Sequence, residues 1–194
     1  MRRNAICLLA LGACLVTGTA WAQQKKSAPM KQSDNLPNLE STLKFIQDKL
    51  NSLGPVSYVS HGHDSNNGHN WTNHFTDEAS RAVANPSLCR VYYHWKTGGD
   101  GHVSMDADVG IRFKDVQKID VLSREEYFNK DNLAFGHPGW TAKVEPSVFV
   151  VRVQRPARVE NQFTFPDEES ARQFAKALTR VVELCGINKE ANEH

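Results

Sequence analysis

Hydrophobic residues recur at helical spacing near the end of the chain. Seven apolar side chains are three or four residues from a neighbour in this stretch: Ala171, Phe174, Ala175, Leu178, Val181, Val182 and Cys185. Such spacing lays one apolar stripe along a helix of about five turns. Asp167 is a suitable N-cap, and Gly186 suits the left-handed residue that ends many helices. We therefore predict an amphipathic C-terminal helix that closes the domain and ends at Gly186.

A shorter helical pattern lies between Asn38 and Leu53. Its apolar residues alternate at intervals of four and three: Leu39, Leu43, Ile46, Leu50 and Leu53. Gly54-Pro55 is expected to end the helix. The stripe covers only about two heptads, which favours packing on a sheet over a coiled coil.

Between the two helices the pattern becomes that of short β-strands. Runs rich in β-forming residues are bounded by turn residues at 56–60, 71–79, 88–96, 109–113, 117–122, 147–154 and 159–165. We expect a polar loop from His61 to Asn70 and a long connection from Ser123 to Pro146, which opens on a capping box and a short helix. The pattern predicts an α+β domain of about seven antiparallel strands with an N-terminal and a C-terminal helix.

Two stretches resemble a known superfold. IRFKDVQKIDVL (111–122) and FTFPDEESARQFAKAL (163–178) resemble the middle hairpin, and the last strand with its capping helix, of pleckstrin-homology (PH) domains. The chain is also similar to uncharacterised exported bacterial proteins over residues 56–186. The PH resemblance implies a barrel or a strongly bent sheet and a binding role for lipid headgroups or peptides. However, the chain has no Lys or Arg between Lys49 and Arg81, where that family often binds phosphoinositides.

The first 22 residues have the features of a bacterial signal peptide. Arg2 and Arg3 precede an apolar run, and Ala20-Trp21-Ala22 fits a signal peptidase site. Leu11 to Cys14 also resembles a lipobox, so a lipid anchor on Cys14 is the alternative. We predict a periplasmic or secreted protein with a signal peptide (1–22), a flexible linker (23–37), one domain (38–187) and a polar tail (188–194). No later stretch is apolar for long enough to span a membrane.

The balance of charge argues against nucleic acid as a partner. Without Arg2 and Arg3 the count of Lys plus Arg falls from 23 to 21, against 22 Asp plus Glu. The mature chain then has a net charge of about −1, whereas nucleic-acid binding depends on an excess of basic residues.

Two cysteines remain in the mature chain, Cys89 and Cys185. An even pair in an exported protein favours a disulfide. Cys89 alternates with apolar strand residues, and Cys185 ends the helical stripe, so both are expected to face the core. The alternative is two buried free thiols.

Histidines cluster in the segment that follows the first strand. His61, His63 and His69, with Asp64 nearby, supply nitrogen and oxygen ligands of the kind that zinc prefers. Their spacing matches no established zinc motif, and polar loops of this composition are commonly solvated turns. A zinc-dependent sensor or enzyme centred on these histidines is therefore the second hypothesis for function.

Aromatic residues in the long connection provide the other candidate site. Phe135, His137 and Trp140 either plug an open end of the sheet or form a contact surface. The sequence lacks the G-x-S-x-G, H-E-x-x-H, phosphate-loop and dinucleotide-binding motifs. We therefore predict a non-catalytic binding module, without a cofactor, for an unknown protein, peptide or small ligand. The binding surface is expected at residues 60–70 and Phe135 to Trp140.

Overall fold

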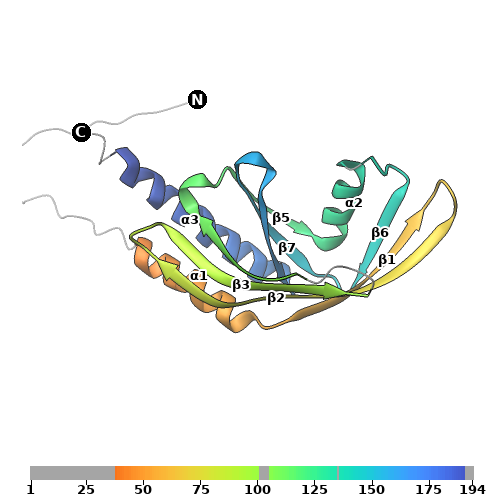
Figure 1. The fold of residues 1–194 in the computed structure, drawn as a ribbon, viewed down its shortest axis with the longest axis horizontal. Coiled ribbons are helices and arrows are strands. Elements are labelled where there is room, and N and C mark those ends of the chain that lie inside the picture. Colours follow the sequence, from red (N-terminus) through yellow and green to blue (C-terminus); the bar gives the residue numbers. More distant parts are fainter. Residues whose placement is uncertain (1–37, 101–104, 135, 191–194) are drawn as a thin grey trace, which may run out of the picture. The chain divides into compact units, whose positions relative to one another are not determined.

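The computed structural model describes residues 38–100, 105–134 and 136–190. In this part of the chain three helices and eight strands form an α+β fold (Figure 1). The helices are α1 (Leu39–Leu53), α2 (Arg124–Ala134) and α3 (Glu168–Glu190). The strands are β1 (Val56–Asp64), β2 (His69–Asn85), β3 (Arg90–Gly99), β4 (Met105–Arg112), β5 (Lys118–Ser123), β6 (Trp140–Glu145), β7 (Phe149–Gln154) and β8 (Glu160–Phe165).

The strands form two antiparallel sheets. Sheet A has the order β4-β3-β2-β1-β6, and sheet B has the order β5-β7-β8. No described strand of sheet A pairs with a strand of sheet B, so the sheets are not closed into a barrel. The barrel implied by the PH resemblance is therefore corrected to two separate sheets, while the α+β class and antiparallel pairing are confirmed.

The predicted N-terminal helix is confirmed. The Asn38 side chain accepts a hydrogen bond from the Ser41 backbone N–H at 2.8 Å, as expected of an N-cap. Three stripe residues are completely buried: Leu43, Ile46 and Leu50. Gly54, with a φ of 68°, ends the helix.

The C-terminal helix is confirmed in position and in its buried face, but its end was predicted wrongly. Asp167 accepts a hydrogen bond from the Ser170 backbone N–H at 2.7 Å, and the stripe from Ala171 to Cys185 packs into the core. Helix α3 continues through Gly186 to Glu190 instead of ending at the glycine. The residues that follow Gly186 include no proline and tolerate helical geometry, so the small cost of an internal glycine does not end the helix.

Both helices share one core with both sheets. Buried side chains of α1 and α3 meet residues from sheet A, such as Val91 and Ile111, and from sheet B, such as Val153 and Phe163. A Cys89–Cys185 disulfide joins the segment before β3 to α3 with a Cα–Cα distance of 6.0 Å. The predicted bridge is thus confirmed over the alternative of free thiols.

Several strands are longer than the sequence pattern predicted. The expected loop from His61 to Asn70 is reduced to a turn at 65–68, because β1 and β2 remain paired as far as Asp64 and His69. The long connection from Ser123 to Pro146 contains α2 and β6, and β6 extends sheet A by pairing with β1. Ser123 caps α2 as predicted, accepting from the Glu126 backbone N–H at 3.0 Å. No helix in the described ranges is both long and apolar enough to cross a membrane.

Candidate functional site: an aromatic groove on the inner face of sheet A

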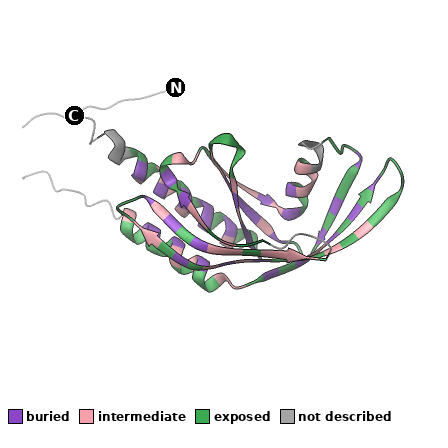
Figure 2. Cartoon of the chain, viewed as in Figure 1, coloured by how far each residue is buried: buried purple, intermediate pink, exposed green. Residues whose placement is uncertain are grey.

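The inner face of sheet A is the face turned toward sheet B. Along β2, the residues of this face become more exposed to solvent toward the tip of the β1–β2 hairpin. Alternate residues of β2 share this face: His69, Trp71, Asn73, Phe75 and Asp77. Asp77 is buried, the next three toward the tip are half-buried, and His69 is exposed. Figure 2 shows half-buried and exposed residues along β2 near the tip of the hairpin, whereas β1 keeps alternating buried residues as far as Asp64. The far end of this face is therefore accessible to a ligand.

A glycine on β1 allows two tryptophans to meet on this face. Gly62 is the partner of Trp71 in the β1–β2 ladder, and a Cβ atom at Gly62 would lie only 1.8 Å from the Trp71 ring. The Trp71 indole thus occupies the space of the missing side chain. It reaches Trp140 of β6, with ring centroids 5.1 Å apart and planes tilted by 55°.

The substitution Gly62→Ala is expected to displace the Trp71 ring and to lower the free energy of unfolding by about 1–3 kcal/mol, because the added methyl group overlaps the indole. Urea denaturation and the NMR chemical shift of the Trp71 indole N–H measure the two effects. Gly186→Ala is the control, since a Cβ there meets no atom within 4 Å. An unmoved Trp71 resonance in Gly62→Ala would contradict the packing described.

The two connections predicted to form the binding surface do lie together. The Ser65 backbone N–H donates to the Gly139 carbonyl at 2.9 Å. The His137 imidazole stacks on Trp140, with centroids 4.3 Å apart and planes inclined by 16°. Phe135 lies outside the described residues. Trp140 is 37% exposed, so it contributes accessible aromatic surface beside the turn at 65–68.

Asp64 holds the turn and Trp140 in place. Its carboxylate accepts hydrogen bonds from the Asn66 backbone N–H at 2.9 Å and from the Asn66 side-chain amide at 3.0 Å. The Trp140 indole N–H also donates to it. These donors, the Asn66 backbone N–H foremost, hold the pKa of Asp64 below its usual value. Asp64 is therefore a carboxylate at neutral pH.

Together these residues line a groove of about 430 Å³, which we call the aromatic groove. Its lining consists of Asp64, Asn67, His69, Trp71, Asn73, Asp100 and Trp140. The described lining contains two carboxylates and two indoles but no Lys or Arg. Half-exposed aromatic rings with a few polar groups are typical of ligand sites. The aromatic rings and polar groups of the lining can therefore contact a ligand.

The predicted zinc ligands do not converge. His61 and His63 lie on the outer face of sheet A, where their Nδ1 atoms contact Thr72 Oγ1 at 3.2 Å and Asn70 Oδ1 at 2.9 Å. His69 lies opposite Asp64 in the ladder and so points to the inner face. Among the described residues no three His, Cys, Asp or Glu side chains form a group that could hold a metal ion. Zinc binding at these histidines stays a prediction without geometric support.

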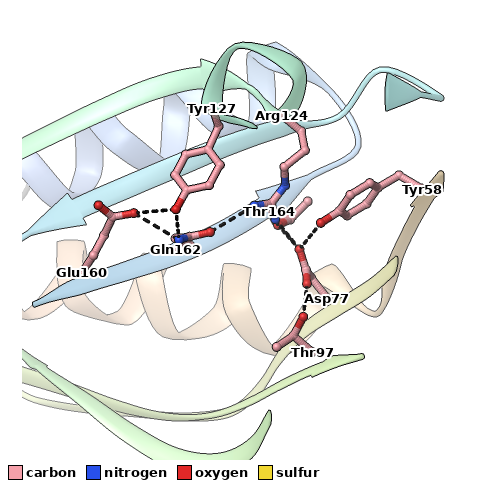
Figure 3. Close-up of polar contacts among 8 residues, drawn as sticks. All are labelled: Tyr58, Asp77, Thr97, Arg124, Tyr127, Glu160, Gln162 and Thr164. Carbon is pink, nitrogen blue, oxygen red and sulfur yellow. Dashed lines mark hydrogen bonds and ion pairs between the residues drawn. The ribbon is translucent and has the colours of Figure 1, made fainter. Parts of the chain in front are cut away.

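Behind the groove, a buried ion pair joins the two sheets (Figure 3). Arg124, at the start of α2, contacts the Asp77 carboxylate of β2, and both residues are less than 9% exposed. Thr97 and Thr164 each donate to Asp77 at 2.6 Å, and Tyr58 donates at 3.2 Å. The carboxylate is thus hydrogen-bonded from β1, β3 and β8, and burial raises the pKa of Tyr58 well above its usual value.

The guanidinium group of Arg124 also has several polar and aromatic neighbours. It donates to Gln162 Oε1 at 3.0 Å and to Thr164 Oγ1 at 2.6 Å. Its carbon lies between 5.1 and 5.6 Å from three ring centroids, those of Tyr58, Tyr127 and Phe128. The charge therefore lies among an anion, neutral acceptors and aromatic faces, while the buried Nε atom of Arg124 has no hydrogen-bond partner among the described residues.

Sequence reasoning missed this ion pair. One signal was present, because Asp77 is in phase with Trp71 and Phe75 and so places a charge on the inner face of a strand. Nothing in the sequence indicated that Arg124, 47 residues later, would be its partner.

A larger hollow, of about 640 Å³, lies between α1 and α3. Its lining combines the apolar residues Phe45 and Ala177 with polar residues of two helix surfaces: Ser41, Thr42, Gln173, Lys176 and Arg180. We prefer the smaller aromatic groove as the candidate site, because two carboxylates, three amide or imidazole side chains and two indoles converge there.

Comparisons of the chain with family models, with curated proteins and with solved structures give no match.

Proposed function

We propose that this protein is an exported, non-catalytic binding module whose ligand occupies the aromatic groove. The observation that carries the proposal is the tilted pair of Trp71 and Trp140, which line a groove to which Asp64 and Asp100 also contribute. Residues from three separate segments contribute to it. Aromatic rings provide a large contact area with few rotatable bonds, which keeps the entropic cost of binding low.

The packing around the groove favours a preformed site. Trp71 is seated against Gly62, and Trp140 is held between its hydrogen bond to Asp64 and its stacking on His137. The buried Asp77–Arg124 pair ties β2, at the base of the hairpin, to sheet B through Thr164. A site held in its binding conformation loses less entropy when the ligand arrives.

Export and the PH resemblance remain part of this proposal. A disulfide between Cys89 and Cys185 supports an oxidising compartment, as a periplasmic or secreted protein would experience. Two antiparallel sheets followed by one C-terminal helix support a PH-like arrangement with a binding role. The absence of Lys and Arg from the described groove lining argues against an anionic headgroup as the ligand.

NMR titration of ¹⁵N-labelled protein tests the proposal directly. The probes are choline, cellobiose, inorganic phosphate and N-acetyl-phenylalanine amide, which represent a cation, a neutral sugar, an anion and a neutral peptide. At least one class is expected to shift the indole N–H resonances of Trp71 and Trp140 and to leave that of Trp95 unchanged. Trp71→Ala should weaken this binding at least about tenfold, because truncation of a central aromatic contact commonly costs more than 1.4 kcal/mol.

Phe45→Ala serves as the matched control, since it removes an exposed aromatic ring from the hollow between α1 and α3. It should leave binding in the aromatic groove unchanged. If all four probes left Trp71 and Trp140 unshifted, or if the shifts clustered around Phe45, the aromatic groove would not be the binding site.

A further inference from the structure

We infer that the aromatic groove recognises an organic cation, such as an alkylated ammonium or a guanidinium group. This inference rests on the proposed function and specifies the chemical class of the ligand. It is drawn from the angle between the two indoles, from the imidazoles beside them and from the sign of the charges around them.

The angle between the indoles favours a compact cation. The planes of Trp71 and Trp140 meet at 55° with their centroids 5.1 Å apart, so the rings form a corner instead of a flat platform. The face of an aromatic ring is negative, and a cation within about 6 Å of a ring centroid is attracted to it. Tilted rings do not offer the single flat platform on which a sugar ring stacks, whereas a compact cation needs only part of one exposed ring face.

Neighbouring imidazoles complete the aromatic surroundings. His69 stacks beside Trp71 with centroids 6.1 Å apart, and His137 covers one side of Trp140. Both histidines are exposed. The two imidazoles therefore extend the aromatic surface around the indoles.

The charges of the groove have the sign that a cation requires. Asp64 and Asp100 both line it, and the described lining contains neither Lys nor Arg. Asp64 is ionised at neutral pH because its carboxylate accepts several hydrogen bonds. The Asp100 side chain is 72% exposed and contacts the imidazole of His74, which lies on the outer face of β2. These two carboxylates place negative charge beside the aromatic corner, which attracts cations and repels anions.

The experiment uses pairs of probes that have nearly the same shape but differ in charge. Choline is compared with 3,3-dimethylbutan-1-ol, its neutral carbon isostere, and N-acetyl-arginine amide is compared with N-acetyl-citrulline amide. Binding is measured with the full mature chain by NMR, from the shifts of the Trp71 and Trp140 indole N–H resonances. At least one cation should bind about tenfold more tightly than its neutral partner, because both the aromatic and the carboxylate contributions depend on its charge. The pair that shows this difference identifies the recognised cation as an ammonium or a guanidinium group.

Two variants with the same change in net charge supply the control. Asp100→Asn removes a carboxylate from the groove and should weaken cation binding several-fold, whereas Asp48→Asn removes an exposed carboxylate on α1 and should not. Equal affinity for both members of each pair, or equal effects of the two variants, would overturn the inference. Shifts of Trp71 and Trp140 by cellobiose alone would overturn it too but leave the proposed function intact. If no probe shifted these two resonances, both this inference and the proposed function would be contradicted.

Discussion

Replacement of both Cys89 and Cys185 by alanine is expected to lower the free energy of unfolding by about 4–5 kcal/mol. The bridge closes a loop of 96 residues, and a cross-link of that span removes much of the conformational entropy of the unfolded chain. It also joins two completely or almost completely buried positions, one before β3 in sheet A and one on α3. Urea denaturation of the oxidised protein and of the Cys89→Ala/Cys185→Ala variant measures the difference.

Reduction of the wild-type protein provides the control for this prediction. With the disulfide reduced by dithiothreitol, wild type should lose most of the same stability while it retains the volume of both sulfur atoms. The variant should not respond to the reductant. A loss below about 1 kcal/mol in reduced wild type would show that the core alone determines the stability of α3 against the sheets, because a bridge of this span is expected to contribute several times more.

The helices could be predicted because their determinants are local. Asn38 and Asp167 cap α1 and α3, and the apolar residues at intervals of three and four form their buried faces. Cys89 and Cys185 could be paired because only two cysteines follow the predicted signal peptide. Each of these conclusions depends on residues whose properties can be read without knowledge of distant contacts.

The limits of the strands could not be predicted because they depend on distant partners. His61 to Asp64 is polar in sequence and looks like a loop, yet β6 pairs with this segment from residues about 80 positions later. The strand predicted at 109–113 likewise begins earlier, at Met105, because β3 pairs with β4 from that residue onward. A polar segment can remain a strand when neighbouring strands satisfy its backbone groups.

Dependence on distant partners also explains which residues of the candidate site were predicted from the sequence and which were missed. His137 and Trp140 were identified from their aromatic character, but Trp71 was assigned only to a strand and its contact with Trp140 was not anticipated. That contact depends on Gly62, whose missing side chain matters only once β1 lies between β2 and β6. The zinc hypothesis did not anticipate that His69 points to the opposite face from His61 and His63, because it placed His69 in a loop where the structure has the paired strand β2.

The substitution Arg124→Met is expected to lower the free energy of unfolding by about 3–5 kcal/mol, because it leaves the Asp77 carboxylate buried without a positive partner. Methionine retains much of the side-chain length and its contact with the rings of Tyr58 and Phe128. The expected loss is therefore mainly electrostatic. Urea denaturation at neutral pH measures it.

A double-mutant cycle distinguishes loss of the charge from loss of packing. Asp77→Ala/Arg124→Met should be more stable than the sum of the single changes predicts, by an interaction energy of about 1–3 kcal/mol, since no unpaired charge then remains in the interior. The control is Lys130→Met on the same helix, whose ion pair with Glu126 is exposed at both ends; it should cost no more than about 0.5 kcal/mol. Additive effects of the two single changes would show that Asp77 and Arg124 act independently. Coupling of the expected size would instead show that the charge on the inner face of β2 is tolerated because α2 supplies its counterion.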